Sequence, residues 1–388
     1  MEEDAEGVPV QPNTDIKAPR VKVVVTGGLG FVGSAVVRAL HEFHPDWHVW
    51  ILDKCNHAPG ELDLLRGCKY EYVQANITDG DSVMRALSLI EPDAVVHTAG
   101  IVPSLSERYA RRLEALVHNT NVEGTRHMVD AASKCGCRAF VYTSSCCAVT
   151  DDMSKSYANI DETWPVAERS SVYGESKAAA ERIVIAANKD PNPMATCVLR
   201  PCVVFGEGDD QLIPPIHACI AKGETRWVIG SATNLWDTVY VGNVADAHVL
   251  AVENLLQSET AAGETFFIQN NEPVSFRDFS LAVWKEFGHF PPAWEIPIPA
   301  GLGWVLGLLA EVFTRVSGTP TTLSRGSVMD ACAMRYASGD KAKSILGYQP
   351  RVGLEDGIRW SCQVSRASQV LRIATLTEVM PIRSMRDA

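Results

Sequence analysis

A tyrosine and a lysine one helical turn apart are the residues of this sequence best suited to catalysis. Tyr173 and Lys177 open a predicted helix that runs to about residue 187, so their side chains share one face. A phenol has a pKa of about 10, and a neighbouring ammonium lowers it by stabilising the phenolate. We therefore expect Tyr173 to accept a proton from a substrate hydroxyl, with Lys177 as the activating cation.

Two serines supply a third group for this chemistry. They follow a predicted strand over residues 138–142, in the order Thr143, Ser144, Ser145. Because side chains alternate along a strand, only one serine of the pair faces the reacting group. We expect Ser145 to hold the substrate oxygen by donating and accepting hydrogen bonds, with Ser144 as the competitor for this role.

A glycine-rich turn near the N-terminus predicts the partner of these groups. An apolar strand over residues 21–25 leads into the turn at residues 26–33, and a helix follows. A second strand over residues 48–52 ends at Asp53. This order of strand, turn, helix, strand and acid is typical of a dinucleotide-binding unit, whereas an isolated glycine motif is weak evidence.

Each part of this unit has a physical role. Gly27 permits a sharp turn, Gly30 lets backbone N–H groups approach a pyrophosphate, and Gly33 lets the helix pack close to the sheet. The helix N-terminus favours the anion. Asp53 accepts hydrogen bonds from ribose hydroxyls and would repel a 2′-phosphate, which predicts NAD as the cofactor.

Strands and helices continue to alternate after this unit. Further strands are predicted over residues 70–75, 94–97 and 196–199. The alternation predicts an α/β fold, a doubly wound (Rossmann) parallel sheet. His97 ends one strand and is interpreted as a packed residue, whereas the backbone at Ala99 and Gly100 is expected to line the cofactor.

The chain is divided by its changes in pattern. Residues 1–20 are predicted to be a disordered leader, residues 21–206 the NAD-binding Rossmann domain, and residues 361–388 a C-terminal tail. Residues 207–360 form mainly a smaller substrate lobe, rich in Trp and Pro. Two predicted strands there, residues 228–230 and 237–241, are expected to return to the Rossmann scaffold, and residues 243–255 to form an amphipathic helix.

Composition and charge narrow the class of protein. The chain has 388 residues, 46% of them hydrophobic, and a net charge of −12, which argues against nucleic acid as a partner. Its eleven cysteines lack zinc-finger spacing, so we predict no metal site and reduced thiols on the cytoplasmic side. The sequence leaves the oligomeric state open, a homodimer included.

An uncharged stretch over residues 296–310 has two interpretations. A helix from Ala300 would hold eleven uncharged residues before Glu311, about half of a membrane span. One interpretation is a helix that covers the substrate lobe. The other is a peripheral membrane contact through residues 300–313, on the endoplasmic reticulum, with Trp304 at the bilayer surface.

In its glycine-rich turn and its Ser, Tyr and Lys residues, the chain resembles the extended short-chain dehydrogenase/reductase family. Within it, the chain is similar to the 3β-hydroxysteroid dehydrogenase group and to fungal sterol-4α-carboxylate 3-dehydrogenases (decarboxylating). The resemblance rests on residues 26–33, 121–125, 142–145, Tyr173 with Lys177, 199–201, 205–209, 237–248 and 346–350.

The resemblance implies a site and a reaction. It implies Ser145, Tyr173 and Lys177 as catalytic residues. It implies that NAD is bound by Gly27, Gly28, Gly30, Phe31, Val32, Gly33, Asp53, Asn76, Ile77, Ala99, Gly100, Asn121, Tyr173, Lys177, Pro201 and Val203. The implied reaction is oxidation of a 3β-hydroxyl on a sterol or triterpenoid, with decarboxylation of the 3-keto acid when a carboxylate stands at C4.

Two other functions stay open. An NDP-sugar epimerase or dehydratase uses the same three catalytic residue types, but it would need cationic groups for a second pyrophosphate. A non-catalytic dinucleotide-binding regulator would have no need to retain Ser145, Tyr173 and Lys177 together. The apolar, Trp-containing residues 296–313 favour the sterol.

Overall fold

A seven-stranded parallel sheet forms the framework of the molecule. The structure is a computed structural model that describes residues 20–55, 63–104, 107, 111–150, 155–166, 170–189, 191–318, 321 and 323–379. The strand order is β12-β7-β5-β4-β1-β2-β3. The strands are β1 Lys22–Thr26, β2 His48–Asp53, β3 Glu71–Gln74, β4 Ala94–His97, β5 Ala139–Thr143, β7 Ala195–Pro201 and β12 Thr265–Ile268.

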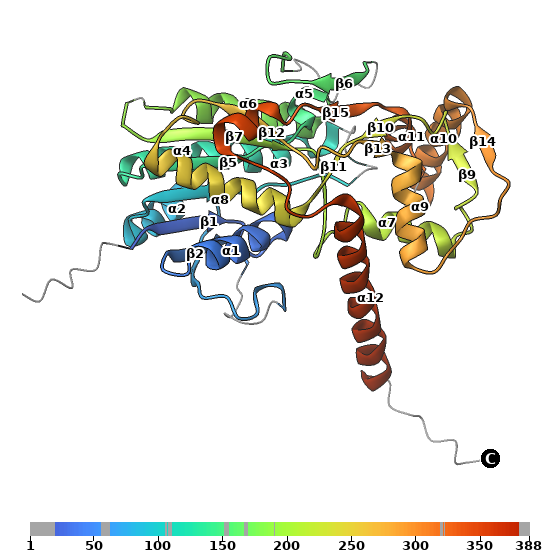
Figure 1. Cartoon of the computed structure of the whole chain (residues 1–388), viewed down its shortest axis with the longest axis horizontal. Helices are drawn as coiled ribbons and strands as arrows, with labels where there is room; N and C mark the ends of the chain where they lie inside the picture. Colours follow the sequence, from blue (N-terminus) through green and yellow to red (C-terminus); the bar gives the residue numbers. More distant parts are fainter. Residues whose placement is uncertain are drawn as a thin grey trace, which may run out of the picture.

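Helices cover both faces of this sheet, which confirms the doubly wound α/β class. On one face α1 (Phe31–Phe43) packs along α8 (Val241–Gln257), as the blue and yellow helices of Figure 1 show. On the other face lie α2 (Gly80–Ile90), α4 (Gly124–Lys134) and α6 (Val172–Ala186). Strands covered on both faces must be apolar throughout, which explains runs such as Val23 to Val25, all fully buried.

The smaller lobe is formed mainly by segments that follow β7, and it lies beside the main sheet (Figure 1). A four-stranded sheet joins β13 (Val274–Ser275), β10 (Leu235–Trp236), β15 (Arg335–Ala337) and β6 (Tyr157–Ile160) in that order. Two short sheets pair β8 (Val203–Phe205) with β11 (Thr238–Tyr240), and β9 (Trp227–Ile229) with β14 (Ile296–Ile298). The helices are α7 (Ile213–Ala221), α9 (Phe276–Glu286), α10 (Ala300–Ser317) and α11 (Arg325–Cys332).

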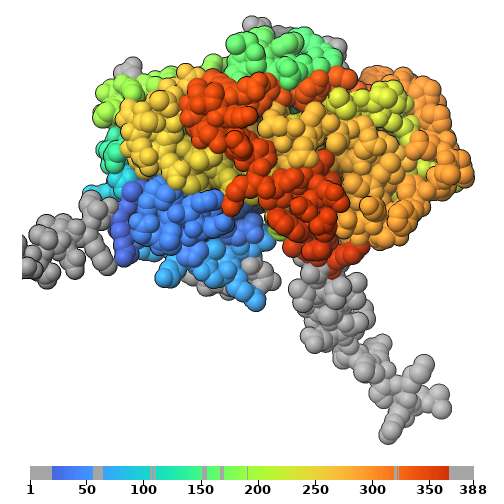
Figure 2. Space-filling model, viewed as in Figure 1, coloured from blue at the N-terminus to red at the C-terminus, as the bar shows by residue number. Residues whose placement is uncertain are grey.

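The remaining segments are short helices and the C-terminal helix. They are η1 (Asp63–Leu65), η2 (Arg111–Leu113), α3 (Glu114–His118), the π-helical η3 (Asn119–Glu123), α5 (Cys147–Thr150) and the π-helical η4 (Ala342–Leu346). Helix α12 (Leu354–Val379) begins against α9, α7 and β11. Figure 2 shows its red first turns between the surfaces of the sheet and the lobe.

One sequence expectation about the lobe is wrong. The strand expected at residues 228–230 does not return to the scaffold, because β9 pairs with β14 inside the lobe. The chain returns to the scaffold through α8 and through β12, which joins the edge of the main sheet beside β7. Except for Arg20, the predicted leader lies outside the described residues.

Helix α10 begins at Ala300, as the sequence predicted, and continues past Glu311 to Ser317. It lies against α11, where a Cβ on Gly307 would come within 2.7 Å of the Arg325 backbone nitrogen. Of its residues, all described, Gly303 and Gly307 are the two that are buried. By length and composition alone it could cross a membrane, with a mean hydropathy of 1.3.

Candidate active site

The glycine turn between β1 and α1 is packed too tightly for side chains. Gly27 has a φ of +66°, and a Cβ there would lie 2.9 Å from the Cα of Ala99. A Cβ on Gly33 would lie only 2.2 Å from the carbonyl oxygen of Gly27. Gly30 is the N-cap of α1, and its lack of a side chain leaves the first N–H groups without a side-chain cap. This cradle fits a pyrophosphate at the N-terminus of α1, where the helix begins with Phe31, Val32 and Gly33.

Asp53 stands at the end of β2, beside this turn. Its Oδ2 accepts a hydrogen bond from the Leu29 N–H at 3.3 Å, and its Oδ1 accepts one from the Cys55 N–H at 3.2 Å. The carboxylate is half-buried and keeps further lone pairs for a ribose. Asn76 is exposed after β3 and bonds within its own turn, whereas Ile77 is buried against Gly124.

The loop after β4 joins the glycine turn to the catalytic helix. The Ala99 N–H donates to the Thr26 hydroxyl at 3.2 Å. The buried Asn121 on η3 fixes the next residues, since its amide bonds both the N–H and the carbonyl of Ile101. A Cβ on Gly100 would lie 3.2 Å from Asn121 Oδ1 and 3.5 Å from Lys177 Nζ. The structure therefore brings Ala99, Gly100, Asn121 and Lys177 together.

Tyr173 and Lys177 lie in the first turns of α6, which Ser171 caps through the Gly174 N–H. Both are buried, and Lys177 Nζ is 5.9 Å from the centre of the Tyr173 ring. The ammonium donates to the Thr143 carbonyl at 2.8 Å. Burial lowers the pKa of Lys177 to about 8, and the charge of Glu181 acts in the opposite direction. An ammonium this poorly solvated interacts strongly with a phenolate beside it.

The two serines have different surroundings. Ser145 Oγ accepts a hydrogen bond from the Cys147 N–H at 3.2 Å, at the start of α5. Ser144 is buried, and its hydroxyl donates to Glu181 Oε1 at 2.5 Å. That contact engages Ser144 inside the protein and leaves Ser145 as the better candidate to bind a substrate. Pro201 lies next to this turn, because its carbonyl accepts from the Cys146 N–H, and the half-buried Val203 begins β8.

Sequence reasoning missed a buried ion pair behind the two serines. Arg200 on β7 donates to both carboxylate oxygens of Glu181, at 2.9 and 2.7 Å, and each side chain is 5% exposed. The available signal was the spacing on α6, because Glu181 stands four residues after Lys177 and eight after Tyr173.

Two buried histidines support the site without facing it. His97 is fully buried at the end of β4, between the hydroxyls of Thr26 and Thr125. Burial and the charge of Lys177 lower its pKa to about 3, so its ring is neutral. His248 on α8 contacts the Thr143 hydroxyl at 2.7 Å, and burial lowers its pKa to about 4. His97 is a packed strand-end residue, as the sequence predicted.

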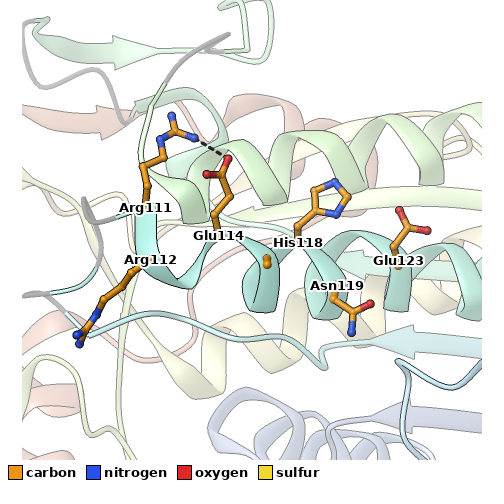
Figure 3. A pocket seen from close by; sticks show the side chains of 7 residues that line it. Arg111, Arg112, Glu114, His118, Asn119 and Glu123 are labelled. Carbon is orange, nitrogen blue, oxygen red and sulfur yellow. Dashed lines mark hydrogen bonds and ion pairs between the residues drawn. The ribbon is translucent and has the colours of Figure 1, made fainter.

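A surface hollow of about 570 Å³ is shown in Figure 3, and none of the proposed catalytic residues lines it. It is lined by Arg111, Arg112, Glu114, Ala115, His118, Asn119 and Glu123. Arg111 pairs with Glu114 of the lining and with Glu175 of α6, so its charge is compensated. The described part of the chain holds no group of three His, Cys, Asp or Glu residues placed to bind a metal.

The arrangement as a whole can transfer a proton beside a dinucleotide. The glycine cradle and Asp53 can hold the pyrophosphate and the ribose. Tyr173, activated by Lys177, can take a hydroxyl proton, and Ser145 can bind the same oxygen.

Comparison with known proteins gives consistent results. The sequence model of the 3-beta hydroxysteroid dehydrogenase/isomerase family matches residues 24–298. The chain is 34% identical to the sterol-4-alpha-carboxylate 3-dehydrogenase ERG26, decarboxylating, of Saccharomyces cerevisiae, over 87% of this chain and 95% of that protein. It is 33% identical to the protein of the same name from Candida albicans, over 87% of this chain and 96% of that one.

Solved structures share the fold. A UDP-glucose 4-epimerase from Stenotrophomonas maltophila superimposes with a TM-score of 0.71 at 21% identity, over 91% of this chain and all of that chain. At this identity the likeness concerns the fold alone. The likeness confirms the fold class, and the sequence similarities confirm the family resemblance that the motifs indicated.

Proposed function

The chain belongs to the 3-beta hydroxysteroid dehydrogenase/isomerase family, and we propose that it oxidises the 3β-hydroxyl of a sterol or triterpenoid with NAD. The substrate we favour carries a carboxylate at C4, because the fungal relatives of this chain are named sterol-4-alpha-carboxylate 3-dehydrogenases. The observation that supports the chemistry most directly is the buried Tyr173–Lys177 pair, with Gly100 of the cofactor loop beside the ammonium.

The cradle formed by Gly27, Gly30 and Gly33, with Asp53, fits NAD. NAD, when bound, accepts the hydride that leaves the substrate carbon. Tyr173 takes the proton of the substrate hydroxyl, since the ammonium of Lys177 stabilises its phenolate. Ser145 holds the same oxygen by a hydrogen bond and keeps it in line with the phenol.

Decarboxylation then follows from the chemistry of the product. A ketone at C3 makes a C4 carboxylate the acid group of a β-keto acid. The carbon–carbon bond breaks, carbon dioxide leaves, and the electron pair passes to the C3 oxygen as an enolate. Ser145 and the protonated Tyr173 can donate hydrogen bonds to that oxygen, which stabilises the developing charge.

A substrate panel tests this proposal. Purified protein with NAD is offered a 4α-carboxysterol, a 3β-hydroxysteroid without the carboxylate, and a UDP-sugar, and NADH absorbance and released carbon dioxide are recorded. We expect NADH with both sterols and carbon dioxide with the carboxysterol alone. NADH formation or epimerisation with the UDP-sugar alone would contradict the proposal.

We further propose that α10 makes a peripheral contact with a membrane such as that of the endoplasmic reticulum. Its outward side carries exposed apolar side chains, at Leu302, Trp304, Val305, Leu306, Leu309, Val312, Phe313 and Val316. Glu311 is paired with Arg325 of α11 at 2.8 Å, so its charge is compensated on the protein side. A bilayer would also supply an apolar substrate.

Flotation with sterol-containing phosphatidylcholine vesicles tests this contact. Burial of two apolar side chains in the bilayer would contribute about 3–6 kcal/mol to the free energy of binding. The double variant Leu309→Glu with Phe313→Glu should therefore bind vesicles at least about a hundredfold more weakly. Leu89→Glu is the matched control, because Leu89 is 72% exposed on α2, away from the lobe. Equal binding by the double variant and the control would refute the contact.

A further inference from the structure

One face of α6 carries a row of three buried ionisable side chains. Tyr173, Lys177 and Glu181 follow one another at intervals of four residues, and they are 7%, 4% and 4% exposed. The proposed mechanism uses the first two and leaves Glu181 unexplained. A buried carboxylate is costly unless its partners compensate it, so its contacts indicate what it does.

Glu181 contacts both strand ends that form the substrate side of the site. It accepts the hydroxyl of Ser144, the neighbour of Ser145, at 2.5 Å. It also accepts two hydrogen bonds from Arg200, the neighbour of Pro201. The Ser144 N–H in turn donates to the Leu199 carbonyl at 2.7 Å. The carboxylate therefore connects α6 to the ends of β5 and β7, where Ser145 must be held.

The second role of Glu181 concerns charge. The ammonium of Lys177 lies 4.9 Å from the ring centre of Tyr142 and donates to the Thr143 carbonyl. Neither group carries a negative charge. Glu181 follows Lys177 by one turn on the same buried face of α6, and its charge raises the pKa of Lys177.

The groups that face this pair come from every packed element. They are Tyr142, the Thr143 carbonyl and Ser144 from β5, Tyr173 from α6, the neutral His97 from β4, Arg200 from β7, Asn121 beside Gly100, and the neutral His248 from α8 through Thr143. Among these described groups Glu181 carries the negative charge that favours the ammonium, partly offset by Arg200.

We propose that Glu181 is a positioning residue of the dehydrogenase: it holds the Ser144–Ser145 turn in place and keeps Lys177 in its charged form. This inference rests on the proposed function for its catalytic consequence. Its two parts make different predictions, because Ser144→Ala removes the contact with the turn and leaves the charge. Glu181→Gln removes the charge and retains the shape of the side chain.

The direct test measures the protonation of Lys177 without substrate. In protein with 13C-labelled lysine, the Lys177 resonance is identified by its absence from Lys177→Met, and its titration midpoint is recorded. We expect a midpoint near 8 in the native protein and about one pH unit lower in Glu181→Gln. Glu175→Gln is the matched control on the same helix, since Glu175 faces Arg111 instead, and it should leave the midpoint unchanged.

The kinetic test follows NADH formation across pH. In Glu181→Gln the alkaline limb of kcat should move to lower pH by about the same one unit, because Lys177 loses its proton earlier. In Ser144→Ala we expect a kcat about tenfold lower, a limb at its native position and a nearly unchanged Kd for NAD.

The outcomes separate the hypotheses. A native protein inactive on every sterol would refute the proposed function, while the NMR titration would still decide the role of Glu181. An unmoved Lys177 midpoint in Glu181→Gln would overturn the inference. Should this variant fail to fold with Arg200 left uncompensated, Glu181→Gln with Arg200→Gln removes both charges. A smaller downward shift of the Lys177 midpoint is then expected, because the cation that partly offset Glu181 is removed as well, and an unmoved midpoint would again overturn the inference.

Discussion

A methyl group added at Gly33 tests whether the turn after β1 is built for close approach of the backbone. A Cβ there would lie 2.2 Å from the Gly27 carbonyl oxygen and 2.8 Å from the Gly28 Cα. Real Cβ atoms stay at least 3.0 Å from such neighbours, so turn and helix must separate by at least about 0.8 Å. Neither neighbour is a flexible side chain, and the strain falls on the backbone that would cradle the pyrophosphate.

Overpacking of this kind costs about 1–3 kcal/mol. We expect Gly33→Ala to weaken NAD binding by about 2 kcal/mol, which is roughly a thirtyfold rise in Kd. Titration calorimetry with NAD measures the Kd, and circular dichroism establishes that the variant is folded.

Gly301→Ala is the matched control. Gly301 lies in α10 with no atom within 4 Å of its would-be Cβ, so this change should leave the Kd unchanged and raise helix stability by up to about 1 kcal/mol. A folded Gly33→Ala protein with an NAD affinity within twofold of the native value would refute the steric argument.

Three further predictions concern the catalytic, cofactor and structural residues. Tyr173→Phe should lower kcat by about 10²–10⁴-fold and leave the Kd for NAD within twofold of the native value. Full activity of this variant in an assay of NADH formation would contradict the role of Tyr173 as the base. Asp53→Ser should narrow the preference for NAD over NADP, measured as the ratio of the two Kd values, because the charge that repels a 2′-phosphate is removed; an unchanged ratio would count against Asp53 as the selecting group. His97 and His248, with pKa values near 3 and 4 against 6.5 unfolded, take up protons more readily when unfolded, so stability should fall as pH falls below about 6.5. By pH 5 each should contribute a loss of about 2 kcal/mol to the free energy of unfolding, and equal urea midpoints at pH 7 and pH 5 would refute this.

The local parts of the site were predictable from short stretches of sequence. The turn at Gly27, the acid at Asp53 and the i, i+4 pair of Tyr173 and Lys177 depend on backbone geometry within about 30 residues. The parallel sheet was predictable too, because strands covered on both faces must be apolar throughout. The catalytic roles of Ser145, Tyr173 and Lys177 remain predictions, which the variants described above test.

The partners of distant segments were not predictable in the same way. Nothing local in residues 228–230 or 265–268 states which strand each will meet, and the edge strand of the main sheet proved to be β12. For the same reason the sequence alone could not decide between Ser144 and Ser145 for the catalytic role. Its partner Glu181 stands 37 residues away and its indirect partner Arg200 stands 19 residues beyond that.

What the sequence by itself determined is which groups can do chemistry and how neighbours on one helix or turn face each other. Only the tertiary structure decided how the charges of Lys177, Glu181 and Arg200 meet and that α10 packs by Gly303 and Gly307 with its apolar side outward. The physical reason is that helix and strand periodicity is a property of the local backbone. Burial and charge compensation depend on which surfaces fold against each other, and those surfaces come from segments far apart in the chain.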